Sequence, residues 1–325
     1  MAFTGHVRKR ETKSGLTTYQ IIVEEEMSCS NGKRKRYYKT IKGNKKEAER
    51  AMRQMITDLE NKTFVKDAKI TVKDFMHQWL DLYIKGQLSP TTVQHYIDQT
   101  ENYIIPEFGN QNIQQLRNID IQKWIFSLQT ASPLTGKPLS PKTIKNIWLN
   151  LSAAMKKAVM LELIPKNPCD NITLPKLERF HPEVYSMEKV AKLLECAKNT
   201  DMYLILMMEI CLGLRRGELL ALKWHHINFN EGILSVEENL VTIGKERITK
   251  APKTKSGVRE IQIPATLLEL LQQTKAERHA GENAYIICQA DGSPYKSDSL
   301  SLKFRRFLKA NHLKHIRFHD LRHIN

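Results

Sequence analysis

The hydrophobic period of this chain changes along its length, and each change restricts the local structure that a segment can adopt. Apolar and polar residues alternate through "TTYQIIVEEE" and "KRKRYYKTIKG", as is typical of strands, and the turn-like segments "TKSG" and "SCSNGK" precede them. The next segment, "NKKEAERAMRQMITDLENK", has apolar residues at helical spacing. We therefore expect residues 1–64 to form a small three-stranded sheet with one helix.

Between Thr71 and about Pro168 the hydrophobic period is helical. Thr71 stands before "VKDFMHQWLDLY", where its hydroxyl is expected to cap a helix. In "LSPTT" and "LSPKT", Ser89 and Ser140 each precede a proline, the pattern of an N-cap followed by proline at the first helical position. We expect residues 65–170 to form an all-helical domain.

A proline-rich stretch separates this domain from the rest of the chain. Residues 164–185 contain four prolines and little periodicity, so we place a linker at 171–183. Residues 184–325 are mainly helical, with an alternating stretch between about Ile233 and Ile263 that predicts two or three strands. At 325 residues the chain exceeds the usual size of a single core, which favours a multidomain, mainly α protein.

The charge of the chain points to a polyanionic partner. Lys and Arg outnumber Asp and Glu by 51 to 35, giving a formal net charge of +16. We expect nucleic acid rather than a membrane, because the longest apolar run, "YLILMMEICLGL", is too short to span a bilayer and contains Glu209. That run predicts a buried helix. The N-terminal "MAFTGHVRKR" has no apolar run behind its charges, so we expect an intracellular, cytoplasmic protein.

The five cysteines lie far apart, with no C-x-x-C pair and no histidine at zinc spacing. This spacing argues against a disulfide framework and against a metal site. We expect reduced thiols, mostly buried, and no metal or other cofactor.

Three short segments in the last region carry candidate chemistry: "GLRRGELLALKW" from Gly213, "APKTKSGVREIQIP" from Ala251 and "HDLRH" from His319. Taken singly, they fit an exposed helix end, a solvated turn and a decorated helix surface. In this order, they resemble the catalytic domain of the tyrosine recombinases, specifically the phage-type and conjugative-transposon integrases. The resemblance implies four catalytic residues, with Lys255 as the alternative for the lysine: Arg215, Lys253, His319 and Arg322.

In that family, a tyrosine hydroxyl attacks a DNA phosphodiester and forms a 3′-phosphotyrosyl link, releasing a 5′-hydroxyl without a metal. The residue types suit this chemistry. Two guanidiniums can stabilise charge on the pentavalent phosphate, and the resemblance implies that Arg215 and Arg322 are these two. A lysine protonates the leaving 5′-oxygen, and His319 acts as acid or base or binds a phosphate oxygen.

Further residues near these segments are weaker candidates. Glu218 lies three residues after Arg215 and is a candidate to hold it, although an exposed helical glutamate is an equal alternative. In "LKWHHINF", His226 and Asn228 stand where the family often has acidic residues, which leaves the local hydrogen bonding open. For the remaining basic candidates, contact with DNA phosphates and a solvated surface are equally good explanations: Arg216, Lys255, Lys303, Arg305 and Arg306.

The resemblance extends over nearly the whole chain. It implies an arm-type DNA-binding domain at 1–64, a helical core-binding domain at 65–170 and a mixed α+β catalytic domain at 184–325. The implied partners are double-stranded DNA at attachment sites, further copies of the chain on that DNA, and an excisionase-type accessory protein.

The position of the tyrosines departs from the family pattern. In the family, the nucleophile follows the second arginine by a few dozen residues, but none of the ten tyrosines here follows His319, and the last is Tyr295. We therefore expect a C-terminally truncated integrase that lacks its nucleophile and is inactive in strand transfer. The alternative is a non-catalytic DNA-binding protein that occupies attachment sites. An RNA-binding protein is a distant third, because no RNP aromatic motif or KH-type G-x-x-G is present.

Overall fold

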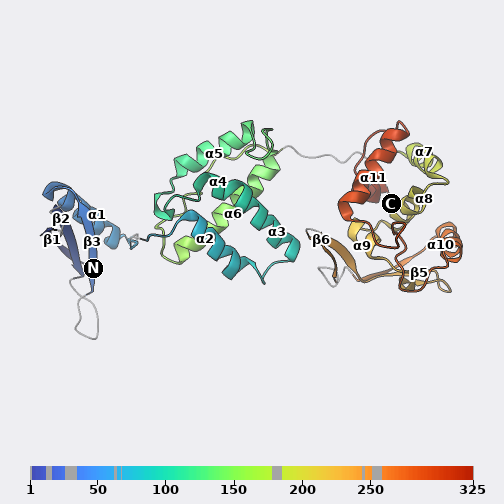
Figure 1. The fold of residues 1–325 in the computed structure, drawn as a ribbon, viewed down its shortest axis with the longest axis horizontal. Helices are drawn as coiled ribbons and strands as arrows, with labels where there is room; N and C mark the ends of the chain where they lie inside the picture. The colour runs from blue at the N-terminus through green and yellow to red at the C-terminus, as the bar shows by residue number, and fades with distance from the viewer. Residues whose placement is uncertain are drawn as a thin grey trace. The chain divides into compact units, whose positions relative to one another are not determined.

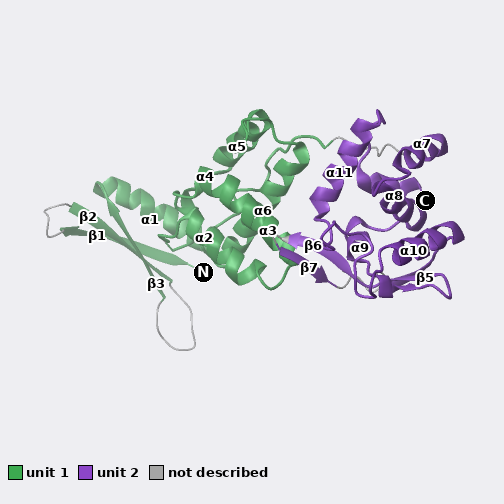
Figure 2. Cartoon of the chain, turned by 45° about the vertical axis from the view of Figure 1, so that its right-hand side comes forward, with its two compact units in different colours: residues 1–177 green, residues 178–325 purple. Residues whose placement is uncertain are grey.

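The computed structural model describes residues 2–11, 17–25, 35–61, 64–66, 68–177, 185–243, 246–250 and 258–324. The chain divides into two compact units, Met1–Leu177 and Glu178–Asn325 (Figures 1 and 2). The finer division into three domains with a linker at 171–183 stays a prediction. The mainly α, multidomain fold class is confirmed, since helices predominate and the strands form small separate sheets.

The chain begins with a three-stranded antiparallel sheet and one helix. The strands, in the order β1-β2-β3, are β1 (Phe3–Glu11), β2 (Thr17–Glu25) and β3 (Arg36–Lys42). Helix α1 (Lys45–Glu60) starts at the N-cap Asn44, which exchanges hydrogen bonds with Glu47 in a capping box. Ile21 and Val23 of the central strand are fully buried in a cluster with Met55 of α1. The predicted sheet with one helix is confirmed.

Helices make up the rest of the first unit. They are α2 (Val72–Trp79), η1 (Leu80–Ile84), α3 (Pro90–Gln99), η2 (Thr100–Ile104), α4 (Ile105–Phe108), η3 (Ile113–Gln115), α5 (Asn118–Thr130) and α6 (Pro141–Met160). The side chains of Thr71, Ser89 and Ser140 each accept a backbone N–H three residues further on, so the three predicted N-caps are confirmed. Their helices enclose one apolar core, in which α6 is central because Ile144, Ile147 and other residues along one face are completely buried.

The second unit combines helices with short strands. Its helices are α7 (Met187–Ala197), α8 (Met202–Leu212), α9 (Arg216–Ala221), η4 (Trp224–His226), α10 (Ala265–Glu277), α11 (Ser297–Ala310) and η6 (Phe318–Ile324). Its strands form the sheets β4-β5-β8 and β6-β7 and are β4 (Ile227–Asn228), β5 (Ile233–Val236), β6 (Asn239–Ile243), β7 (Glu246–Lys250) and β8 (Arg259–Gln262). The prediction of two or three strands between residues 233 and 263 is wrong, since four are present there. Strand β5 ends at Val236 and pairs with β8, whereas β6 and β7 pair with each other.

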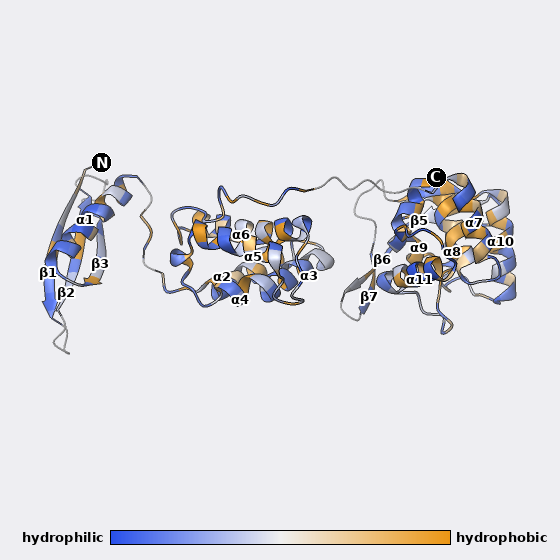
Figure 3. Ribbon diagram, turned by 90° about the horizontal axis from the view of Figure 1, so that it is seen from above, coloured by the Kyte–Doolittle hydropathy of each residue, from blue (hydrophilic) through white to orange (hydrophobic). Residues whose placement is uncertain are grey.

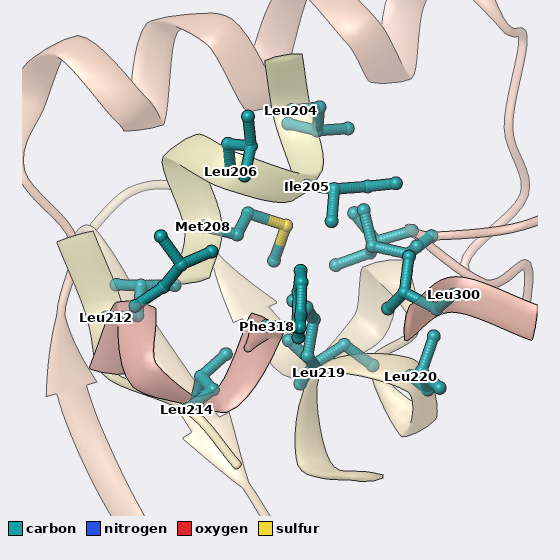
Figure 4. Packing of buried hydrophobic residues seen from close by; sticks show 14 of the residues in the cluster. Leu204, Ile205, Leu206, Met208, Leu212, Leu214, Leu219, Leu220, Leu300 and Phe318 are labelled. Atoms are coloured by element: carbon teal, nitrogen blue, oxygen red, sulfur yellow. The ribbon is translucent and has the colours of Figure 1, made fainter. Parts of the chain in front are cut away.

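Helix α8 lies at the centre of the second unit. It is apolar nearly all round, and Figure 4 shows Met208 pointing toward Leu219 of α9 and Phe318 of η6. Helices α7 and α8 pack together, and both carry apolar residues, drawn orange in Figure 3. The predicted buried helix is confirmed.

Two further expectations concern membranes and thiols. Among the described residues, no helix has both the length and the apolar character needed to cross a bilayer. The four described cysteines are free, but only Cys169 is buried. The expectation of mostly buried thiols is therefore wrong for Cys196, Cys211 and Cys288, which are half-buried.

Candidate active site

The first candidate arginine lies at the junction of two helices. Helix α8 ends at Leu212, and Gly213 follows in the left-handed conformation with φ of +57°, which glycine adopts without a side-chain clash. The chain then turns outward: Leu214 is fully buried, and Arg215 is the N-cap of α9 with 57% of its side chain exposed. The "GLR" segment therefore ends a buried helix and presents the arginine at the surface.

Glu218 holds Arg215 in place, as the sequence suggested. Its carboxylate accepts the backbone N–H of Arg215 at 2.9 Å and the Nη1 of the same residue at 2.7 Å. Only 3% of the Glu218 side chain is exposed. Burial raises the pKa of Glu218, but hydrogen bonds from Arg259 and Arg215 outweigh burial and hold that pKa below its ordinary value. Glu218 is therefore an ionised, buried anchor for the arginine.

Arg259 is a site residue that the sequence reasoning missed. It lies on β8, and its Nη2 donates to the Oε2 of Glu218 at 2.9 Å. The two residues are separated by 41 positions. A single basic residue in an alternating strand gives no sequence signal that separates it from ordinary surface charge. One carboxylate thus binds two guanidiniums from different elements.

His319 and Arg322 lie on the 3-10 helix η6. A 3-10 helix has three residues per turn, so residues three apart lie on one side of it. Phe318, Asp320 and Leu321 are buried and anchor η6, while His319 is exposed and Arg322 half-buried. Burial, followed by the charge of Arg322, lowers the pKa of His319, so the neutral imidazole is favoured at neutral pH.

Arg322 itself is not held by a carboxylate contact. In the part of the chain that the structure describes, its guanidinium forms no hydrogen bond or ion pair. By contrast, Asp320, which is 2% exposed, accepts from the Nε and Nη2 of Arg317. Arg322 therefore has donors available for an anionic ligand.

Glu209 of α8 is a buried carboxyl that interacts electrostatically with charged residues of η6 and α9. Glu209 lies on α8 and has no exposed surface, and neither carboxyl oxygen has a hydrogen-bond partner among the described residues. Burial raises its pKa to about 8, against the opposing charge of Arg322, while Glu218 raises it further. The same carboxyl therefore lies within the electrostatic range of η6 and of the first turn of α9. Helix α8 packs against η6, which bears His319 and Arg322, and the chain passes from the end of α8 through Gly213 to Arg215 at the start of α9.

The other sequence candidates fall into three groups. Lys253 and Lys255 lie outside the described residues. Arg216 donates to the Oγ of Ser301 at 2.6 Å, which fixes it against α11, whereas Arg305 and Arg306 of α11 are exposed. Lys303 forms an ion pair with Asp201 and donates to Tyr295 at 2.9 Å, so its ammonium already has protein partners. Their roles in binding DNA stay predictions.

The two unusual residues after α9 replace the expected acidic acceptors. The Nδ1 of His226 accepts the backbone N–H of Lys223 at 3.0 Å, and the Oδ1 of Asn228 accepts the backbone N–H of Glu231 at 3.2 Å. The local hydrogen bonding that the sequence left open is therefore intact. The rings of His225 and His226 are in contact, with centroids 4.2 Å apart and an interplanar angle of 48°. Among the described residues, no three His, Cys, Asp or Glu side chains are grouped as metal ligands.

Known families match two parts of the chain. Residues 183–325 match the model described as "Phage integrase family", and residues 71–129 match "Phage integrase, N-terminal SAM-like domain". The first match covers α8, α9 and η6, and therefore all the arginines of the candidate site. The second covers the helical region from α2 to α5.

Similar proteins extend over most of the chain. A tyrosine recombinase XerC-like protein of Caldanaerobacter subterraneus is 29% identical, over 96% of this chain and 85% of its own length. The ICEBs1 integrase of Bacillus subtilis is 29% identical, over 69% of this chain and 64% of its own length.

Solved structures share the fold. The Tn1549 transposon integrase in complex with transposon right end DNA aligns with a TM-score of 0.66 at 20% identity, over 78% of this chain and 85% of that one. A lambda integrase tetramer bound to a Holliday junction aligns with a TM-score of 0.61 at 19% identity, over 97% of this chain and 89% of that one. With the motif order, the two family models and the similar proteins show that the chain belongs to the phage integrase family of tyrosine recombinases.

Proposed function

We propose that this chain is the DNA-binding and phosphate-binding part of a site-specific recombinase of a phage or other mobile element. Its substrate is duplex DNA at attachment sites, and it works on that DNA with further copies of itself. The net charge of +16 supports a polyanionic ligand. Two of the similar proteins support the element type, since one is named as a putative prophage integrase and the other is a transposon integrase solved in complex with DNA.

The proposal is supported by the two elements that adjoin α8: Arg215 follows its C-terminal end at the start of α9, and η6, which bears His319 and Arg322, packs against it. Arg215 is oriented by a buried carboxylate, and Arg322 has donors without a protein acceptor among the described residues. Guanidiniums bind phosphate oxygens in pairs of parallel hydrogen bonds and keep their charge at every physiological pH. Two of them stabilise the extra charge that a phosphodiester gains as it becomes pentavalent.

The reaction served by this site is transfer of a phosphodiester to a tyrosine. The tyrosine oxygen bonds to phosphorus, and the bond between phosphorus and the 5′-oxygen breaks. Neutral His319 is suited to accept the tyrosine proton, since its pKa is held low. Lys253, or alternatively Lys255, gives a proton to the leaving 5′-oxygen. The reverse steps join the tyrosine-linked 3′-phosphate to a new 5′-hydroxyl.

Within these 325 residues we propose binding without strand transfer. Two tyrosines of the second unit have hydroxyls already engaged: Tyr185 donates to the carbonyl of Lys314, and Tyr295 accepts from Lys303. Burial also raises the pKa of Tyr185, which makes it a poorer nucleophile.

The phosphate-binding role is tested by neutralising single phosphates. A duplex containing the footprinted binding sequence is made with one methylphosphonate at each position in turn. One position should weaken binding of the unaltered chain about ten- to a hundredfold, since charged hydrogen bonds are lost there. Arg215→Gln and Arg322→Gln should abolish the discrimination at that position only. If every position gives the same affinity, the arginines do not bind a particular phosphate.

The absence of strand transfer has a separate test. The 325-residue polypeptide is incubated with nicked attachment-site DNA that traps a covalent intermediate. We expect retained, salt-sensitive binding and no covalent protein–DNA adduct. A phosphotyrosyl adduct would overturn this part of the proposal and would identify one of the ten tyrosines as the nucleophile.

A further inference from the structure

We propose that Arg259 is a positioning residue that neutralises Glu218 and so leaves the charge of Arg215 available to a DNA phosphate. This inference rests on the proposed function, because Arg215 is the guanidinium assigned there to the phosphate. It adds a third arginine to the site, one that acts through Glu218 rather than on DNA.

The geometry assigns different tasks to the two guanidiniums. The Oε1 of Glu218 accepts from Arg215 at 2.7 Å, and its Oε2 accepts from Arg259 at 2.9 Å. The Arg215 side chain is 57% exposed, whereas that of Arg259 is 27% exposed and that of Glu218 is 3% exposed. Arg215 is therefore exposed and keeps further donors for a ligand, whereas Arg259 binds the carboxylate from strand β8.

Charge balance gives Arg259 its importance. Arg215 with Glu218 alone would be a neutral pair, and a neutral pair attracts a phosphate far less than a cation does. With Arg259 the three residues carry a net charge of +1, since both guanidiniums stay protonated and the carboxylate stays ionised. The buried position of Glu218 makes this compensation effective, because water screens the charges little there.

Arg259 begins the strand that follows the candidate lysines in the sequence. Strand β8 begins at Arg259, which lies opposite Val236 of β5. Lys253 and Lys255 precede Arg259 by six and four residues in the sequence. The ion pair between Arg259 and Glu218 therefore ties the start of the strand that follows both lysines to the first turn of α9.

The test measures how much a single phosphate charge contributes to binding. The methylphosphonate position at which Arg215→Gln loses discrimination defines the phosphate, and the affinity ratio of ordinary to methylphosphonate duplex is then measured for each variant. Arg259→Gln should lower the ratio about tenfold, while Arg259→Lys, which keeps the charge, should retain most of it. Glu218→Gln combined with Arg259→Gln should regain a large part of the ratio, because Arg215 then stands beside no carboxylate.

The controls separate this inference from a purely structural role. Arg278 donates to the carbonyl of Ile286 in the same unit, and Arg278→Gln should leave the ratio unchanged. Thermal unfolding of each variant shows whether it is folded at the temperature of the measurement. If the glutamine variants are unfolded at that temperature, Arg259→Lys is measured in their place. A wild-type ratio in Arg259→Gln, or a double variant no better than Arg259→Gln alone, would overturn the inference. If Arg215→Gln changes the ratio at no position, the proposed function fails as well.

Discussion

The second unit buries other kinds of polar residue than the helical region of the first unit does. In residues 68–177 the buried polar residues are Thr100, Ser132 and Asn150, all uncharged. The second unit buries three carboxyl groups and an imidazole, which are Glu209, Glu218, Asp320 and His226. Burying an ionised group is unfavourable unless it is paired, so the ionised carboxylates Glu218 and Asp320 require cationic partners.

The paired carboxylates of the second unit are bound to arginines. Glu218 binds Arg215 and Arg259, and Asp320 binds Arg317. In the helical region, Asn150 of α6 instead donates to the carbonyl of Tyr96 at 3.0 Å and so joins two helices. The comparison teaches that buried polarity joins helices at Asn150 of the helical region, whereas at Glu218 and Asp320 of the second unit it binds arginines. The two should therefore lose stability for different reasons.

The largest effect is expected in the helical region and should not depend on pH. Trp124 is 3% exposed and packs edge-on against Phe108 with ring centroids 5.0 Å apart. Trp124→Ala should lower the free energy of unfolding of this region by about 4 kcal/mol through lost burial and a cavity. Urea unfolding at pH 6 and pH 9 measures it. Phe126→Ala, on the same helix but 68% exposed, is the control and should cost far less. A loss that varies with pH would break the comparison.

Glu209 should make the second unit less stable as pH rises. Its pKa is about 8 in the folded chain and about 4.5 when exposed, so the unfolded chain releases the proton first. The stabilising contribution is complete at low pH and is lost between about pH 4.5 and 8. We expect a decrease of about 3 kcal/mol in the unfolding free energy of the second unit between pH 5 and 9.

The matched variant for this prediction is Glu209→Gln, which keeps the shape and cannot ionise. Hydrogen exchange of α8 amides, which reports local opening, should show a much smaller pH dependence of stability in the variant after correction for intrinsic exchange. An unchanged pH dependence would mean that Glu209 is ionised throughout or finds a partner.

Asp320→Asn should lower the stability of the second unit by about 2 kcal/mol at neutral pH, because charged hydrogen bonds to Arg317 are lost. A hydrogen bond from Arg317 is the main cause that lowers the pKa of Asp320, so its contribution is present at neutral pH and is lost as pH falls through that pKa. Chemical denaturation at several pH values should show the two proteins converging in acid. The exposed Asp298, tested as Asp298→Asn, should have no measurable effect. A difference that persists in acid would exclude the ion pair as its cause.

The smallest effect is expected at His226, whose neutral Nδ1 accepts the N–H of Lys223. Burial is the main cause that lowers the pKa of His226, so the stability due to the neutral ring is present at high pH and is lost as pH falls below about 6.5. His226→Asn keeps an acceptor that does not titrate and should be less sensitive to acid by about 1 kcal/mol at pH 5. Thermal unfolding at pH 5 and 7.5 measures this, with exposed His315→Asn as the control. Equal acid sensitivity in both variants would show that the His226 cap does not titrate.

Local patterns in the sequence predicted much of the fold and part of the site. Thr71, Ser89 and Ser140 cap helices because the accepting oxygen and the donating N–H are only three residues apart. Glu218 reaches Arg215 over the same separation. The motif order also indicated the family, which the matches over residues 183–325 and 71–129 confirm. In each case the partners or the pattern lie within one short segment.

Only the tertiary structure decided which distant charges meet. The Arg259–Glu218 pair joins residues 41 positions apart, and the pair of Lys303 with Asp201 joins residues 102 positions apart. In the sequence, Glu209 looks like any glutamate that interrupts an apolar run. The packing around α8 removes its carboxyl from water and leaves it without a partner among the described residues. Hydrogen bonds over three residues follow from the geometry of one helical turn, whereas pairing over long separations depends on how whole elements pack. Sequence alone therefore predicted three helix starts and the family, and packing determined which distant charges pair.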